Sequence, residues 1–401
     1  RQYGDVPLIT TNMTADEANI QPRTSADKVF QFIDEECEAI EDLITEDYGN
    51  LGDLAMSPAN NGRANNLAVM ALRARAALYH ASPLFNASND KSLWQKAAEL
   101  NKAVLDACSL RGMKLSNDYK GLFIGNTNWS DANAVGEIIF GRRMPTENRT
   151  FETYNFPVGI TGAGAGGGGG NCPTLNLVEA YEDKVTDKRF AQTIACNGEL
   201  WPNANTVPLE TYYGGLNGLP TAYATPTGYY LKKYVTESVQ IAGNGANTCK
   251  HVWVTFRLGE FYLNLAEALF NLSGDGYTAP SGFQTSATPV YYINQIRRRA
   301  GLGNLATDLS ATDFLAKYEN ERFVELAFEG HRFFDVRRWK KGSTYFKNIR
   351  GMNIIKNADG TFTETPVTVQ TRQWDEKMNL FPIPQSEIMK SGGVLTQNPG
   401  W

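Results

Sequence analysis

Apolar residues recur at helical spacing in several long segments of the chain. In residues 25–46 they return every three or four positions, and Ser25 stands before them as a helix N-cap. Two further helices are predicted at residues 64–82 and 93–109, which are rich in small residues and joined by a short loop. Two such helices side by side are the unit of a tetratricopeptide-type hairpin. A second pair, residues 255–272 and 289–300, fits that unit more loosely.

The middle of the chain has a different character. Residues 112–253 are rich in Gly, Asn, Thr, Pro and Tyr, with short strand candidates such as 135–143 and one helical segment at 173–183. The segment is too aromatic to be a disordered linker, so we interpret it as a loop-rich insert over a helical scaffold. The predicted divisions are a helical scaffold at 1–111, the ligand-facing insert at 112–253, and a second helical pair with the C-terminal region at 254–401.

The C-terminal part contains local signals of its own. Ser310 and Asp313 form a capping box that opens a helix predicted to run to about Glu329, and a short helix follows Gly330. A β-hairpin is predicted to turn at Asp359-Gly360. The fold class is therefore mainly α, with a mixed insert and a small C-terminal hairpin.

Composition and charge exclude some classes of protein. The chain has 401 residues, is 42% hydrophobic and carries a formal net charge of −5 without any basic block, which argues against a nucleic-acid partner. No apolar run is long enough to span a membrane as a helix. The five cysteines lie far apart and favour buried thiols over a metal site, although Cys172–Cys196 or Cys196–Cys249 could pair in an oxidising compartment.

Motifs for catalysis are missing from the sequence. The glycine-rich run at 161–174 lacks the lysine of a phosphate loop, so we interpret it as backbone that passes close to another element before a helix. No GxSxG or HExxH pattern occurs, and there are three histidines in all. Paired carboxylates of a glycosidase leave no local motif and stay possible.

Residues 321–339 gather acidic and basic side chains at helical spacing. They suit either a metal or acid/base site, or a helix that folds around its own ion pairs. Arginines compete with any metal for these carboxylates, so we favour the ion pairs, with Arg332 in reach of Glu329 and Arg338 in reach of Asp335. The charged residues of this segment are Glu321, Arg322, Glu325, Glu329, His331, Arg332, Asp335, Arg337 and Arg338.

The same segment carries a resemblance to a known family. Its sequence ERFVELAFEGHRFFDVRRW is similar to the C-terminal signature of SusD/RagB-family proteins, which are outer-membrane nutrient-binding lipoproteins. Four more stretches agree in the family's order, namely GGGGGNCPTLNLVEAYE at 166–182, RLGEFYLNLAEAL at 257–269, INQIRRRAGL at 293–302 and NLFPIPQSEIMKSGGVLTQNPGW at 379–401. The resemblance covers essentially the whole chain.

The resemblance implies a tetratricopeptide-like scaffold and a binding protein rather than an enzyme. No cofactor is expected, and the sequence motifs assign no metal-binding residues. Such a protein captures oligosaccharide or polysaccharide at the cell surface and delivers it to a SusC-type TonB-dependent outer-membrane transporter. The sequence opens where family members are already well into their first helical repeats. Outer-membrane attachment through an N-terminal lipid anchor is therefore implied by the family and lies outside this sequence.

Aromatic residues in the irregular loops are the predicted sugar contacts, since rings stack on the apolar faces of pyranoses and amides bond hydroxyls. Each ring has an alternative interpretation as part of the insert's own core. The predicted ligand-binding residues are Trp129, Trp201, Tyr212, Tyr213 and Tyr223, with Asn203 and Asn205 beside them.

Three alternatives stay open at the level of sequence. The chain could be a peptide-binding lid of a RagB-like importer, which would need strand edges more than rings. It could be a non-catalytic tetratricopeptide-type scaffold that binds protein. The third alternative is the glycosidase with dispersed carboxylates.

Overall fold

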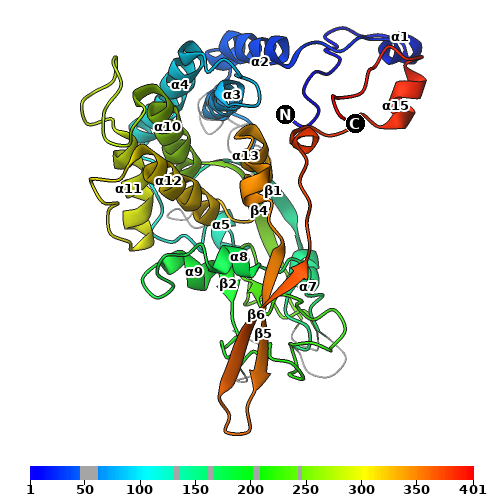
Figure 1. The fold of residues 1–401 in the computed structure, drawn as a ribbon, viewed down its shortest axis with the longest axis vertical. Helices are drawn as coiled ribbons and strands as arrows, with labels where there is room; N and C mark the ends of the chain where they lie inside the picture. The colour runs from blue at the N-terminus through cyan, green and yellow to red at the C-terminus, as the bar shows by residue number, and fades with distance from the viewer. Residues whose placement is uncertain (46–61, 131–135, 161–165, 202–207, 243–245) are drawn as a thin grey trace, which may run out of the picture.

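The helical scaffold fills the upper part of the molecule (Figure 1). The computed structural model describes residues 1–45, 62–130, 136–160, 166–201, 208–242 and 246–401. α3 packs between α2 and α4, and α10 packs against both α4 and α11. The predicted helical segments are confirmed here, with ends that differ by a few residues. The scaffold helices are α2 (Ala26–Glu41), α3 (Asn66–Ala81), α4 (Lys91–Leu110), α10 (Leu258–Ser273), α11 (Pro289–Ala300) and α12 (Ala311–Glu325).

Small residues bring the first two repeat helices together. Ala71 and Ala74 on α3 and Ala97 on α4 are fully buried, so the two backbones approach closely. The buried Asn101 amide donates to the carbonyl of Ala74 at 3.1 Å and ties the pair. This crossing is what the alanine-rich segments predict.

The insert is built from short elements below the scaffold. Its longest sheet pairs β1 (Ile138–Asn148) with β4 (Cys249–Arg257), which leads directly into α10. The insert has a hydrophobic cluster of its own, and a second cluster joins its residues Leu175, Leu177 and Tyr181 to Val324 on α12. The other elements are β2 (Ile194–Ala195), β3 (Tyr230–Leu231), α5 (Thr127–Ser130), α7 (Thr150–Asn155), α8 (Leu175–Val178) and α9 (Lys188–Thr193).

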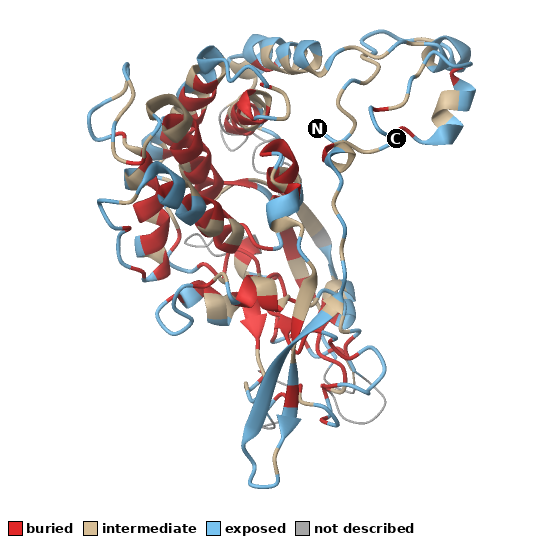
Figure 2. Ribbon diagram, viewed as in Figure 1, coloured by how far each residue is buried: buried red, intermediate tan, exposed pale blue. Residues whose placement is uncertain are grey.

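The predicted C-terminal hairpin is confirmed. β5 (Ile349–Lys356) pairs antiparallel with β6 (Phe362–Gln370), and Gly360 takes a φ of +86° in the turn. The hairpin projects from the lower end of the molecule, and most of it is exposed (Figures 1 and 2).

Two predicted helices differ from the observed ones. The segment 173–183 forms only the four residues of α8, which Thr174 caps through its side chain. α12 ends at Glu325 rather than at Glu329, because the chain turns through Phe328 and Gly330, both with positive φ. The short helix after Gly330 is α13 (Arg332–Arg338), followed by α14 (Gly342–Tyr345).

The two ends of the chain lie together. The backbone N–H of Phe381 donates to the Gln2 carbonyl at 2.8 Å, and the Arg23 guanidinium bonds the side chain of Asn398. The remaining short helices, α1 (Ala15–Asn19), η4 (Glu376–Asn379) and α15 (Gln385–Lys390), belong to these terminal segments. Within the described ranges, no helix has the length and apolarity needed to cross a bilayer. All five cysteines are free thiols, so neither of the two pairings left open by the sequence forms.

The ion-pair interpretation of residues 321–339 is confirmed, with partners mostly from elsewhere in the chain. Glu325 is fully buried and lies against the guanidinium groups of Arg189, Arg257 and Arg299. Asp335 pairs with Arg338 as expected, at 2.9 Å. Burial alone would raise the pKa of Glu325, but the three arginines outweigh it and hold the pKa well below its usual range.

The expected pairing of Arg332 with Glu329 is wrong. The turn at Gly330 directs Arg332 away, and its guanidinium lies over the rings of Phe323 and Tyr345 at 4.3 and 4.1 Å. Glu329 instead bonds Lys233 at 2.7 Å.

Acid is expected to weaken the fold through His331. Burial lowers the pKa of this imidazole from 6.5 to about 4, although Glu260 opposes the shift. The unfolded chain therefore binds a proton below pH 6.5 that the folded chain takes up only near pH 4. The free energy of unfolding should fall by roughly 3 kcal/mol as the pH drops across this interval. Urea unfolding of the wild type and His331→Gln at several pH values checks this, and equal pH slopes for both would contradict it.

Candidate functional site

The glycine-rich run serves as packed backbone, as the sequence predicts. Gly166–Gly170, the glycine ribbon, runs along the C-terminal end of α7, and its N–H groups donate to α7 carbonyls such as Thr153 and Tyr154 at 2.7 and 2.8 Å. A Cβ added to Gly167 would lie 2.0 Å from the Phe156 carbonyl oxygen. Any side chain at that position would separate the ribbon from α7.

Two exposed tyrosines flank this ribbon. Tyr154 on α7 is 67% exposed and Tyr223 is 83% exposed. A Cβ on Gly169 would lie 2.3 Å from the Tyr223 carbonyl oxygen, and one on Gly168 would lie 2.8 Å from the Tyr154 carbonyl oxygen. The ribbon therefore lets the backbones of both tyrosines approach it closely while their side chains stay exposed.

Alanine at Gly169 is expected to cost more stability than alanine at Gly214. Both glycines have positive φ, +59° and +84°, so each substitution carries the strain of a left-handed residue, about 1–2 kcal/mol. Only the Gly169 substitution adds a collision with backbone, whereas Gly214 faces open space. Thermal unfolding should therefore show at least ~1 kcal/mol more loss for Gly169→Ala. Equal losses would mean that the ribbon is not tightly packed.

An aromatic pocket opens beside the ribbon. Its volume is about 290 Å³, close to the lower end of small-molecule sites at about 300 Å³. The rings of Phe151 and Trp253 lie 5.0 Å apart, and Tyr234 is tilted on Trp253 at 5.7 Å. The lining residues, which define the aromatic pocket below, are Phe151, Asn171, Leu231, Tyr234, Trp253, Phe328 and Glu329.

Two residues of this pocket have strained backbones. Tyr234 and Phe328 take φ values of +67° and +63°, which bulky residues rarely adopt. Tyr234 directly follows Lys233, and Phe328 directly precedes Glu329. Lys233 and Glu329 form a buried ion pair with 2.7 Å between Nζ and Oε1. Burial would raise the pKa of Glu329, but Arg257 and Lys233 outweigh it and lower the pKa to about 2, so the carboxylate is charged. The ion pair can thus hold both strained aromatic residues in place, and such strain tends to gather at ligand sites.

Trp201 corrects one expectation of the sequence analysis. Its side chain is 3% exposed and packs edge-to-face on Phe156 at 5.2 Å, inside the core of the insert. It fills the insert core beside Phe156 instead of offering a ring to solvent. We therefore do not assign it to the ligand.

The other predicted residues fall in different places. Tyr213 and Tyr223 are exposed, at 59% and 83%. Tyr212 is half-buried and its ring lies 5.6 Å from that of Phe362, so it attaches the insert loop to the hairpin. Asn203 and Asn205 lie outside the described residues, and Trp129 lies on α5 with its side chain outside the description.

Sequence reasoning missed Tyr154, Phe151, Trp253 and Phe328. Phe151 and Tyr154 belong to the aromatic stretch FETYNF at 151–156, shortly before the glycine run. The closeness of this stretch to the glycine run is a sequence feature that could have identified both residues as candidates. Phe328 lies within the signature segment that the sequence analysis had assigned to structure alone. The segment therefore both holds the scaffold and forms one wall of the pocket.

One buried cluster has the residue types of a metal site. The ligand atoms of Glu152, Cys249 and His251 lie within 4.8 Å of one another. The imidazole Nε2 of His251 lies 2.9 Å from the Glu152 carboxylate and 3.3 Å from the Cys249 sulfur. Burial raises the pKa of the Cys249 thiol to about 12, so the thiol is protonated at neutral pH. The three side chains are thus hydrogen-bonded to one another through His251 within the insert core.

Comparisons with known proteins agree with this architecture. The family model of the SusD family matches residues 136–401. The SusD-like protein P2 of Formosa agariphila is 23% identical over the whole of this chain and 70% of its own length. A SusD-like protein from Bacteroides fragilis superposes with a TM-score of 0.77 at 24% identity, covering 100% of this chain and 76% of that one. The surface glycan-binding protein A from Bacteroides uniformis gives a TM-score of 0.64 at 20% identity, with 99% and 73% covered.

These structural neighbours share the fold, and the family model spans well over half of the sequence. The segment 321–339, which contributes to the buried ion pairs and to one wall of the aromatic pocket, lies within the matched range. This chain therefore belongs to the SusD family.

Proposed function

We propose that this protein binds glycans at the cell surface, with the aromatic pocket and the two tyrosines of the glycine ribbon as its binding site. The observation that carries the proposal is the pair of strained aromatic residues, Tyr234 and Phe328, in a pocket that Asn171 joins to the end of the glycine ribbon. The names of family relatives support the same class of ligand, since one solved neighbour is a SusD-like carbohydrate binding protein and another a surface glycan-binding protein.

The chemistry of the site suits a sugar chain. Aromatic faces take the C–H faces of pyranose rings, and the Asn171 side chain at the pocket rim offers an amide for hydroxyls. Asn171 is exposed and its own NH₂ group bonds the buried Asn155 at 2.8 Å, which fixes its orientation. The pocket would hold one ring, while Tyr154 and Tyr223 would support neighbouring units.

The transport role follows from the family. We propose that the bound glycan passes to a SusC-type TonB-dependent transporter and that a lipid anchor holds the protein at the outer membrane. The protein itself would bind and release its ligand without cleaving it. Co-purification of the full-length protein with a tagged SusC-type partner from the native outer membrane tests this part, and the recovery of each protein without the other would contradict it.

A peptide ligand is the second candidate, and one observation favours it. The outer edge of β5 bonds the insert loop through Thr227 and Tyr213, at 2.9 and 2.8 Å. Among the described strands β6 pairs with β5 alone, and it is exposed along nearly its whole length. An extended peptide could add to that edge as a third strand.

Affinity gels that contain a panel of neutral polysaccharides test the proposal. Retarded migration in at least one gel, without release of shorter products, is expected. If no polysaccharide retards the protein and unrelated peptides bind it in calorimetry, the peptide function replaces the glycan function. Shorter products would reveal a glycosidase.

A further inference from the structure

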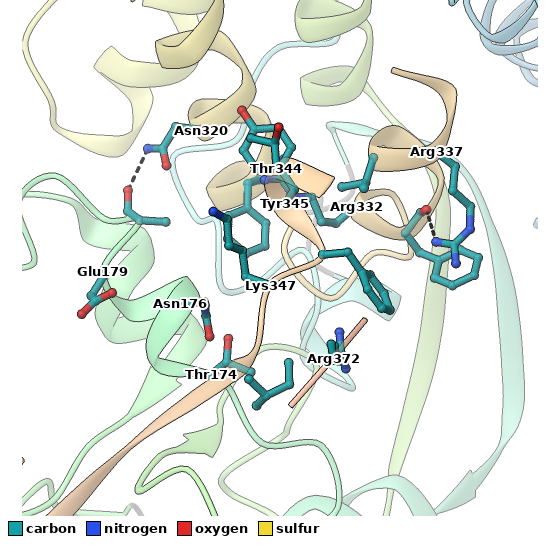
Figure 3. A pocket seen from close by; sticks show the side chains of 16 residues that line it. Thr174, Asn176, Glu179, Asn320, Arg332, Arg337, Thr344, Tyr345, Lys347 and Arg372 are labelled. Carbon is teal, nitrogen blue, oxygen red and sulfur yellow. Dashed lines mark hydrogen bonds between the residues drawn. The ribbon is translucent and has the colours of Figure 1, made fainter. Parts of the chain in front are cut away.

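A second hollow lies on another part of the molecule, between α8, α12, α13 and the start of β5 (Figure 3). Its volume is about 510 Å³, and it continues into a shallower depression with which it shares Asn176, Phe346, Lys347 and Arg372. We call the two together the cationic cleft. None of its lining residues belongs to the aromatic pocket.

The charge of this cleft is opposite to that of the whole chain. Five cationic residues line it against one acid, Glu179, in a protein whose net charge is −5. Glu179 pairs with one of the five, Arg350. The cationic residues are Arg332, Arg337, Lys347, Arg350 and Arg372.

The arginines of the cleft differ from the other buried arginines of the chain. Arg189, Arg257, Arg322 and Arg338 each lie within 2.8 Å of a carboxylate oxygen. In the described part of the chain, no carboxylate lies within ion-pair distance of the four cleft cations other than Arg350. Of these four, Arg337 is buried, and a buried cation is expensive without an anion.

Arg337 shows this most clearly. It is 8% exposed, and among the described residues its donors bond two backbone carbonyls, those of Phe333 and Met378 at 2.9 and 3.1 Å. Its guanidinium lies 3.6 Å from the ring centre of Phe333. The aromatic ring supports the cation without neutralising it.

The cleft also has the surfaces that a sugar requires. Arg332 lies over Tyr345 and Arg372 over Phe346, at 4.1 and 4.7 Å, so the cleft wall holds aromatic rings beside its guanidinium groups. Polar side chains such as Thr174 and Asn320 also line the cleft (Figure 3). A single inorganic anion would leave most of a 510 Å³ hollow unfilled.

We propose that the cationic cleft is a second saccharide site, selective for sugars that carry carboxylate or sulfate groups. Guanidinium groups bind both anions with two parallel hydrogen bonds, and the neighbouring rings take the apolar face of the same sugar unit. This inference goes beyond the proposed function and does not rest on it, since the two sites share no residue.

Calorimetry with charge-matched pairs of polysaccharides tests the proposal. Polygalacturonate and its full methyl ester differ in the carboxylate, while dextran sulfate and dextran differ in the sulfate. We expect at least one charged member to bind about tenfold or more tightly than its neutral partner, with a preference that weakens as salt is added. Equal binding of both members in both pairs would overturn the proposal.

Variants locate the preference in the cleft. Lys347→Gln with Arg372→Gln removes two cations from the rim and should reduce binding of the charged polysaccharide about tenfold or more. Lys188→Gln with Arg298→Gln removes two exposed cations elsewhere and should leave binding within about twofold. If both double variants behave alike, the polyanion binds by general charge and the cleft is not its site.

Further measurements distinguish a saccharide from a peptide ligand, and the cationic cleft from the aromatic pocket. Arg372→Lys keeps the positive charge but loses the planar pair of donors of the guanidinium. Its affinity for the charged polysaccharide should therefore lie between those of the wild type and Arg372→Gln. A glutamate-rich peptide that binds the cleft more tightly than either charged polysaccharide would overturn the assignment to saccharides. Tyr154→Ala with Tyr223→Ala should leave the acidic ligand unaffected, so this proposal and the proposed function can fail separately.

Discussion

Replacing Glu325 with glutamine is expected to lower the free energy of unfolding by about 3–5 kcal/mol. The carboxylate is fully buried, 2.7 Å from Arg257 and 3.0 Å from Arg189, with Arg299 bonded to the same group. A neutral amide in its place removes the buried negative charge that the three guanidinium groups share, while other partners such as Glu137 and Glu321 remain. Urea unfolding monitored by circular dichroism gives the measurement.

Glu387→Gln is the matched control. Its pairing with Lys390 joins two side chains that are 46% and 58% exposed. An exposed pair of this kind is worth less than about 1 kcal/mol. A similar loss for the two variants would show that the buried network does not hold the scaffold.

The double substitution Tyr154→Ala with Tyr223→Ala is expected to weaken glycan binding about a hundredfold. Each ring is more than half exposed in the free protein and would cover one sugar face, a contribution of about 1–1.5 kcal/mol. Two such losses combine to about 3 kcal/mol, or roughly two factors of ten. Calorimetry with the polysaccharide that performs best in the affinity gels measures the change.

Tyr291→Ala serves as its control, because Tyr291 is 46% exposed on α11 and lies outside the pocket. Binding of this variant should stay within about twofold of the wild type. If the tyrosine pair and Tyr291 give equal effects, the ribbon tyrosines do not contact the ligand.

The scaffold could be predicted because its signals are local. Residues 289–300 are predicted and observed as the same helix, since Thr288 caps it, Pro289 suits its first turn and Gly301 ends it. The hairpin turn at Gly360 is equally local. The ends of α8 and α12 were predicted less well, because the turn through Phe328 depends on a positive φ that no local rule assigns to phenylalanine.

The sequence predicted that residues 321–339 form ion pairs, but it did not identify most of their partners. The sequence places carboxylates and arginines together at 321–339, yet Glu325 finds Arg189 and Arg257 across 136 and 68 residues of chain. Arg332 was expected to pair with Glu329 and instead lines a cleft whose one acid, Glu179, pairs with Arg350. Only the fold decides which arginine reaches which acid.

The candidate site was predicted in part. Loop aromatic residues were the right class, but composition alone does not tell a ring in the insert core, such as Trp201, from an exposed one, such as Tyr223. The pocket joins α7, β4, the segment after β3 and the signature segment, and no local spacing connects these. Tyr223 stays a prediction until a ligand is located.

Covalent footprinting of exposed side chains, with and without saturating glycan, tests the central claim most directly. With the ligand bound, labelling of Tyr154, Tyr223 and Phe328 should fall, while labelling of Tyr291 should stay constant. These four side chains are 67%, 83%, 37% and 46% exposed in the free protein, so each gives a signal. Unchanged labelling at the first three, or protection confined to β6 or the cationic cleft, would contradict a glycan site at the aromatic pocket.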